Sequence, residues 1–204
     1  MKKTLNYLVI AVFAISAAFM SCDKNKDDDN NGNGNGNGNT GNSFVIEAKD
    51  VIGGHGSYND IVTVRLYNLY RVSAKFENNG FKLTLPALES DELVIITQRG
   101  SLLFEGSLES LTISDREAKI KTVFVEAYNA ENNLIGYIHQ LNGSDGNIIV
   151  YYSYLDSDVT IKGEANGADF DLSFKKGWNM WYIGNNRLTT QKPSGVDFKW
   201  YYVN

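Results

Sequence analysis

Apolar and polar residues alternate along most of residues 44–204, and this period of two constrains the fold more than any other feature of the chain. Successive side chains of a β-strand point to opposite faces, so an alternating segment buries one face. Residues 148–152 are apolar on both faces, which is typical of a central strand. The alternation itself is clearest over 71–76, 81–85, 122–127, 159–163, 170–175 and 198–202.

Asn and Gly residues separate these segments at the spacing of hairpin turns. Asn-Gly and Asp-Gly supply the positive φ that such turns need. The candidate turns are 53–54, 78–80, 142–143, 145–146, 166–167, 176–177 and 185–186. The pattern predicts an all-β fold of about ten to twelve strands. We expect a two-sheet antiparallel β-sandwich of the immunoglobulin, prealbumin or jelly-roll kind, with a lipocalin-like β-barrel as the alternative. Residues 114–118 are also compatible with a helical turn.

The beginning of the chain differs in composition from the rest. Two lysines precede an apolar run over residues 7–20, and the small residue Ser21 precedes Cys22. A basic start, an apolar run and a small residue before the cleavage point define a secretory signal peptide. The run is shorter than the ~20 apolar residues that a membrane span needs. We therefore predict a signal peptide over residues 1–21.

The residues around Cys22 resemble a bacterial lipoprotein signal. Phe19-Met20-Ser21-Cys22 resembles the lipobox, in which the cysteine is acylated and becomes the first residue of the mature chain, although Phe19 stands where Leu is usual. The acidic segment 23–29, with its lysines, resembles the export signal of Bacteroidetes-type surface lipoproteins. The resemblance implies an outer-membrane lipoprotein that is anchored through acylated Cys22 and faces the cell exterior. The periplasmic face is the alternative.

The segment 22–43 is predicted to be a tether. Residues 30–42 are Asn and Gly except for Thr40, so they have no apolar surface whose burial could offset the entropy of ordering. A Gly-rich coil as long as residues 23–43 has a root-mean-square end-to-end distance of about 25 Å. Residues 44–204 then form one predicted β-sandwich domain. Within it, 154–163 and 170–179 resemble segments of uncharacterised Bacteroidetes-type surface lipoproteins, a resemblance that implies no catalytic residues.

Charge and cysteine content narrow the chemistry. The chain has 19 basic and 24 acidic residues, and removal of residues 1–21 leaves 17 basic residues and a net charge of −7. With no basic stripe in the domain, nucleic acid is not an expected partner. Cys22 is the single cysteine. Once it is acylated, no thiol remains for a disulfide, a nucleophile or a zinc site.

Catalytic and metal-binding patterns are weak. His55, Ser57 and Asp60 are close in sequence, but closeness in sequence is not the geometry of a triad. The other histidine, His139, is expected to be a partly exposed strand residue.

Aspartates two residues apart share a strand face, which is compatible with glycoside hydrolysis or with calcium. The pairs are Asp156 with Asp158 and Asp169 with Asp171. Because aspartates commonly flank turns and line exposed strand faces, we expect no enzyme activity, no cofactor and no firm metal site, with Asp156 and Asp158 as calcium candidates.

Aromatic residues give the most useful functional hint. Neighbouring rings on a strand point to opposite faces, so some of them are expected to be exposed and able to stack on sugars. The candidates are Trp178, Trp181, Tyr182, Trp200 and Tyr202. We expect a non-catalytic surface module that binds glycan or another extracellular ligand. The alternative is an interaction subunit of an envelope complex, and a glycoside hydrolase is the least favoured interpretation.

Overall fold

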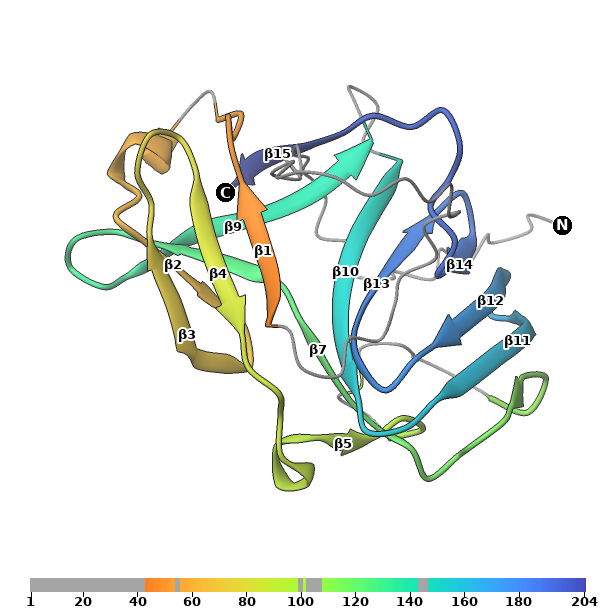
Figure 1. Cartoon of the computed structure of the whole chain (residues 1–204). Helices are drawn as coiled ribbons and strands as arrows, with labels where there is room; N and C mark the ends of the chain where they lie inside the picture. Colours follow the sequence, from red (N-terminus) through yellow and green to blue (C-terminus); the bar gives the residue numbers. More distant parts are fainter. Residues whose placement is uncertain (1–42, 54–55, 99–100, 102–107, 143–146) are drawn as a thin grey trace, which may run out of the picture.

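The computed structural model describes residues 43–53, 56–98, 101, 108–142 and 147–204, and its described regular structure is almost entirely strand (Figure 1). Two short 3-10 helices are present, η1 (Gly56–Asp60) and η2 (Ser90–Glu92). The strands are β1 (Phe44–Ala48), β2 (Thr63–Leu66), β3 (Leu69–Lys75), β4 (Phe81–Leu85), β5 (Val94–Ile95), β6 (Thr112–Ile113), β7 (Lys119–Val123), β8 (Val125–Tyr128), β9 (Leu134–Asn142), β10 (Ile148–Leu155), β11 (Val159–Ala165), β12 (Ala168–Phe174), β13 (Gly177–Gly184), β14 (Arg187–Thr189) and β15 (Phe198–Val203).

The strands form a small sheet and a large one. β1 pairs with β4 in the two-stranded sheet, and the main path of the large sheet runs β3-β2-β8-β9-β10-β13-β14-β12-β11-β6. β15 adds to β9, β7 adds to β10, and β5 adds to β7. Among the described pairings all are antiparallel except β12 with β14 and one isolated bridge. The described strands do not close into a barrel, so the all-β sandwich prediction is confirmed and the barrel alternative is not.

Local sequence explains most of the turns. Asn78 and Asn79 have φ of 52° and 55° before β4, and Asn166 has φ of 54° between β11 and β12. Asn185 and Asn186 turn β13 into β14 in the same way. Asparagine tolerates this left-handed region because its short polar side chain hydrogen-bonds locally. The predicted turns at 78–80, 166–167 and 185–186 are therefore confirmed.

The stretch 114–118 has no helical turn, contrary to the interpretation that the sequence allowed. Instead the Asp115 carboxylate accepts hydrogen bonds from the backbone N–H groups of Glu117 and Ala118, at 3.0 and 3.1 Å. An aspartate side chain that binds the backbone two or three residues further on offers the chain an alternative to helix. The helical turns lie elsewhere, in η1 and η2.

The first hydrophobic core lies between the β1–β4 sheet and the inner face of β2, β8, β9 and β15. Its fully covered members include Ile46 on β1, Val64 on β2, Val125 on β8, Ile138 on β9 and Trp200 on β15. β4 fits the sequence prediction residue for residue, with Phe81, Leu83 and Leu85 buried between exposed neighbours. This core therefore joins segments from both ends of the described chain.

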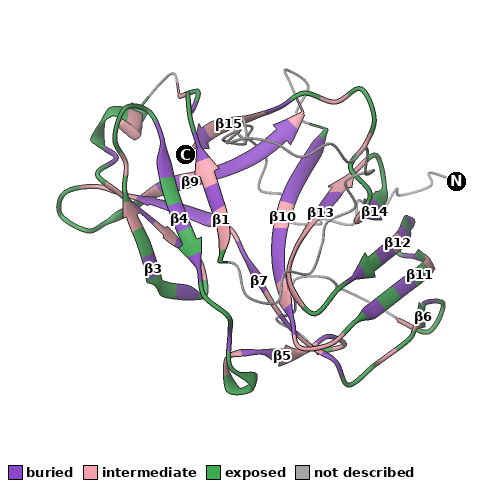
Figure 2. Cartoon of the chain, viewed as in Figure 1, coloured by how far each residue is buried: buried purple, intermediate pink, exposed green. Residues whose placement is uncertain are grey.

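A second core lies on the other side of β10 and β13, under β11, β12 and β14. It contains Leu155, Phe174 and Trp181, each at most 1% exposed. β10 and β13 lie in the middle of the molecule, between the N-terminal strands and the β11–β12 pair (Figure 1). Figure 2 shows β10 buried along most of its length, whereas β11 and β12 alternate between buried and exposed residues. The predicted central strand at 148–152 is therefore confirmed.

The region of β8, β9 and β15 is closely packed at one glycine. Gly136 on β9 lies so near β15 that an added Cβ would be 2.3 Å from the Val203 carbonyl oxygen and 2.5 Å from the Tyr202 ring. A backbone oxygen at that distance cannot move aside without displacing the strand. Only glycine fits here, because the pairing of β9 with β15 brings the two backbones together.

We predict that Gly136→Ala lowers the free energy of unfolding by about 1–3 kcal/mol, because a methyl group forced into a filled space displaces β15. Urea denaturation followed by tryptophan fluorescence measures the change. Ser73→Ala, at an exposed position of β3, is the control and should change stability by less than ~0.5 kcal/mol. Equal stability of Gly136→Ala and the parent chain would contradict the prediction.

Candidate functional site

The predicted aromatic set does not form an exposed surface. Trp181 and Trp200 are each 1% exposed, Tyr182 is 4% exposed and Tyr202 is 9% exposed. The expectation that some of these rings are exposed is wrong for both Trp181 and Tyr182, because β13 lies between two cores. Trp181 enters the second core while Tyr182 enters the first.

The polar ends of these rings are used inside the protein. The Trp181 indole N–H donates to Ser153 Oγ at 2.9 Å, and the Trp200 indole N–H donates to the Glu47 carbonyl at 3.2 Å. Trp178 is the half-buried member of the set. Its N–H donates to the Pro86 carbonyl at 2.7 Å. We infer that the five residues stabilise the fold, and that a stacking surface for sugars has to be sought elsewhere.

The calcium candidates face different partners. Asp156 Oδ1 accepts the Lys119 backbone N–H at 2.8 Å, whereas Asp158 forms an ion pair with Lys175 at 2.7 Å and accepts the Lys176 N–H at 2.9 Å. These bonds lower the pKa of Asp158, led by the one from Lys175. Among the described residues no group of three or more His, Cys, Asp or Glu side chains could hold a metal ion. The two carboxylates therefore fasten β10 to β7 and β11 to β12.

The second carboxylate pair is bridged by an arginine. Arg187 on β14 lies 3.3 Å from the Asp169 carboxylate and 2.9 Å from that of Asp171, and Lys162 lies 3.4 Å from Asp171. Both acids thus have cationic partners on the exposed face of β12. This arrangement fits a surface ion network, which contributes about 0–1 kcal/mol per pair.

His55 and Cys22 lie outside the described residues. The other two members of the His55, Ser57 and Asp60 grouping can be placed. Ser57 Oγ is 2.5 Å from the Tyr202 hydroxyl, and Asp60 is exposed at the end of η1. The serine hydroxyl therefore helps to hold η1 against β15.

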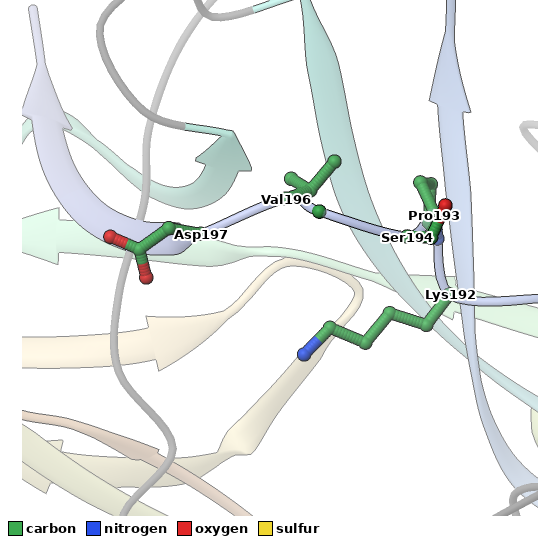
Figure 3. A pocket seen from close by; sticks show the side chains of 6 residues that line it. Lys192, Pro193, Ser194, Val196 and Asp197 are labelled. Carbon is green, nitrogen blue, oxygen red and sulfur yellow. The ribbon is translucent and has the colours of Figure 1, made fainter.

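A shallow hollow lies along the loop before β15, lined by residues 192–197. Figure 3 shows Lys192 and Asp197 extending from the two ends of this loop in different directions. The Lys192 ammonium lies 5.9 Å from the centre of the Phe198 ring. The hollow is open to solvent and formed by one loop, so it offers no converging groups to a ligand.

Aromatic rings do gather on the face of the large sheet that is turned away from the first core. We call this surface the tyrosine face and define it by Tyr67, Tyr70, Phe124, Glu126, Tyr128 and Tyr137. Its residues lie on β3, β8 and β9, directly after β2 and directly before β8. The face lies opposite Val64, Val125 and Ile138 because side chains alternate along each strand.

The rings of the tyrosine face are in mutual contact. Tyr67 stacks on Phe124 with ring centres 4.4 Å apart and planes within 13°. Tyr137 meets Phe124 edge-on at 5.7 Å. Tyr70 is 56% exposed and is the most accessible ring of the group. Desolvation, and then the charge of Glu126, raise the pKa of Tyr70.

A buried carboxylate lies among these rings. Glu126 is 3% exposed and stands in register between Arg65 on β2 and Tyr137 on β9. The Tyr128 hydroxyl donates to Glu126 Oε2 at 2.9 Å. Burial and this bond to the carboxylate raise the pKa of Tyr128 to about 12. The Arg65 guanidinium lies over the Tyr128 ring at 4.6 Å and donates to Asn132 Oδ1.

His139 forms the inner border of the tyrosine face. Its ring stacks on Phe124 at 5.8 Å, it is 6% exposed, and its Nε2 has no hydrogen-bond partner among the residues that the structure describes. The expectation of a partly exposed histidine is therefore wrong. Burial lowers the pKa of His139 to about 4, so the imidazole is neutral at pH 7.

Sequence reasoning did not find this surface, although part of its signal was present. Phe124 and Glu126 occupy the strand face opposite Val123 and Val125, which the alternation predicts to be solvated. The sequence indicated this surface only by placing a phenylalanine and a glutamate on a strand face that was predicted to be solvated. Tyr67 and Tyr70 joined them only through the pairing of β2 with β3 and β8, which no local pattern encodes.

Comparison of the chain with protein-family models, with curated proteins and with solved structures gave no match. Within the described ranges, no helix has the length and apolar character that crossing a membrane requires. The function must therefore be argued from the chemistry of the tyrosine face and from the signals in the sequence.

We predict that the buried imidazole makes stability pH-dependent. The folded pKa of His139, about 4, lies below its usual 6.5, so on acidification the unfolded chain takes up the proton first. The stability contributed by the neutral ring is complete above pH 6.5 and is lost as the pH falls towards 4. The loss should be on the order of 3 kcal/mol.

His139→Phe keeps an aromatic ring without a titrating group, and it should remove this part of the pH dependence. Denaturation curves of both proteins between pH 7.5 and 4 measure the difference. The unpartnered Nε2 leaves little to lose at pH 7.5. Parallel stability curves for the two proteins, or an imidazole titrating near 6.5 by NMR, would contradict the prediction.

Proposed function

We propose that the chain is a lipid-anchored, non-catalytic surface module that binds glycan on its tyrosine face. The observation that carries the proposal is the Tyr67–Phe124 stack, flanked by Tyr137 and the exposed Tyr70. Flat rings stack on the apolar faces of sugars, and a few converging polar groups fix the hydroxyls. Glu126 and Arg65 lie in the adjacent cross-strand row and offer an acceptor and donors.

The predicted localisation supports the same function. A signal peptide that ends at residue 21 would place a diacyl or triacyl anchor on Cys22, the first residue of the mature chain, and each buried methylene contributes about 0.8 kcal/mol to membrane binding. The acidic, Asn/Gly-rich tether over 23–43 would let the domain reorient above an outer membrane. A mobile binding module at the cell surface meets large, variably placed polymers.

We predict that the chain becomes acylated in a bacterial host and that Cys22→Ser abolishes acylation. Metabolic labelling with an alkyne fatty acid, followed by fractionation, tests this. The parent chain should carry label in the outer membrane and lose its domain to protease added to intact cells. The Cys22→Ser variant should be unlabelled, and a labelled variant would refute anchoring at this residue.

We predict that the full-length chain, purified in detergent, binds one or more oligosaccharides of a broad neutral and charged panel in isothermal titration calorimetry. Tyr70→Ala and Tyr67→Leu should each weaken binding about tenfold, because a stacked ring contributes on the order of 1 kcal/mol. Tyr70 is exposed, so its truncation leaves the fold intact.

Trp178→Ala is the matched control for these variants. It removes a half-buried ring that packs on Tyr154 and Phe44 at the border of the first core, outside the tyrosine face. Its affinity should stay within twofold of the parent chain. Binding that is insensitive to both tyrosine substitutions would refute the proposed site. Absence of binding across the panel would favour a subunit of an envelope complex.

A further inference from the structure

Glu126 is a carboxylate whose burial is not matched by a cation. It is 3% exposed, yet it makes no ion pair with any described residue. Its hydrogen bond from the Tyr128 hydroxyl supplies a neutral donor. A buried carboxylate is normally paired with a cation or coordinated to a metal, because its desolvation is costly.

Arg65, the neighbouring cation, is held away from this carboxylate. Although Arg65 is the cross-strand neighbour of Glu126, its guanidinium lies over the outer ring, Tyr128, and donates to Asn132. The pKa of Glu126 is raised, since burial outweighs the opposing effects of Tyr128 and Arg65. Among the described residues, the charge of Glu126 is therefore compensated only in part.

The rings around Glu126 favour a second cation. The face of an aromatic ring carries negative charge density and attracts ammonium and guanidinium groups. Arg65 already uses the Tyr128 ring in this way, at 4.6 Å. Tyr137 is the cross-strand neighbour of Glu126 and meets Phe124, on which Tyr67 stacks, and the exposed Tyr70 lies on β3 of the same face.

We propose that the ligand of the tyrosine face is a glycan with free amino groups, whose protonated amine pairs with Glu126 while the sugar ring stacks on Tyr70 and Tyr67. This inference rests on the proposed glycan-binding function and specifies its ligand. An amino sugar supplies in one molecule the two features that the face complements, an apolar ring face and a cation. Binding would place an ammonium group beside a buried carboxylate whose charge Arg65 compensates only in part.

The test compares sugars that share one backbone. The full-length chain in detergent is titrated at pH 6.5 with a β-1,4-linked glucosamine hexamer, with its fully N-acetylated counterpart and with cellohexaose. Three proteins are measured: the parent chain, Glu126→Gln, and Glu131→Gln. Glu126→Gln keeps a carbonyl oxygen that can accept the hydrogen bond from Tyr128. Glu131→Gln is the control, because it removes one negative charge from an exposed position in the β8–β9 turn. Spermine serves as a polyamine without a sugar ring.

We expect the parent chain and Glu131→Gln to bind the amino hexamer at least tenfold more tightly than the acetylated one, and Glu126→Gln to bind the two equally. Spermine should bind no more tightly to the parent chain than to Glu126→Gln.

Equal affinities of the parent chain for the three hexamers would overturn the amine preference and leave glycan binding standing. A preference that Glu126→Gln retains, or that Glu131→Gln loses, would assign it to general charge attraction and overturn the proposal. Failure of all three hexamers to bind would also overturn the amino-sugar proposal. Binding of another neutral sugar from the panel would in that case support the proposed glycan-binding function without the amine preference.

Discussion

Two strands that contribute side chains to both hydrophobic cores stabilise this protein most. β10 and β13 send Val150, Tyr152 and Tyr182 into the first core and Leu155 and Trp181 into the second. A buried polar chain fixes their mutual position. The Trp181 N–H donates to Ser153, Ser153 shares a hydrogen bond with Thr122 on β7, and Thr122 donates to the Ser101 carbonyl. Because an unsatisfied buried polar group costs about 1–3 kcal/mol, these bonds select one register for three strands.

The tyrosine face depends on the same arrangement. Residues 119–128 form nearly one strand, but its first half pairs with β10 and its second half with β9, and Phe124 lies at the change. Tyr67 lies beside this point, since its backbone N–H donates to the Phe124 carbonyl at 2.9 Å and its ring stacks on that of Phe124. A surface of stacked rings around a buried carboxylate is thus a product of sheet topology and not of any compact motif.

The alternation of residues predicted the strands well because burial of one face is a local property. β4 and the central character of β10 followed directly from it. The partner of β10 could not be predicted, since register is set by contacts between distant segments. Alternation alone predicts one buried and one exposed ring for neighbours such as Trp181 and Tyr182. Both are buried because β13 pairs with β10 between the two cores. For the same reason His139 was expected to be partly exposed and Glu126 to be solvated, although both are buried.

The pairing of β15 has a consequence for how the chain folds. β15 supplies Phe198, Trp200 and Tyr202 to the first core, and it is also bridged to Ile52 near the start of the domain. Contacts over such sequence separations form slowly, because loop closure precedes the gain from burial. The first core is therefore incomplete until β15 has paired with β9 and with Ile52, whatever part of the core has already collapsed. Separation of β15 from its two neighbours would expose Phe198, Trp200 and Tyr202 at once, so this strand acts as the clasp of the first core.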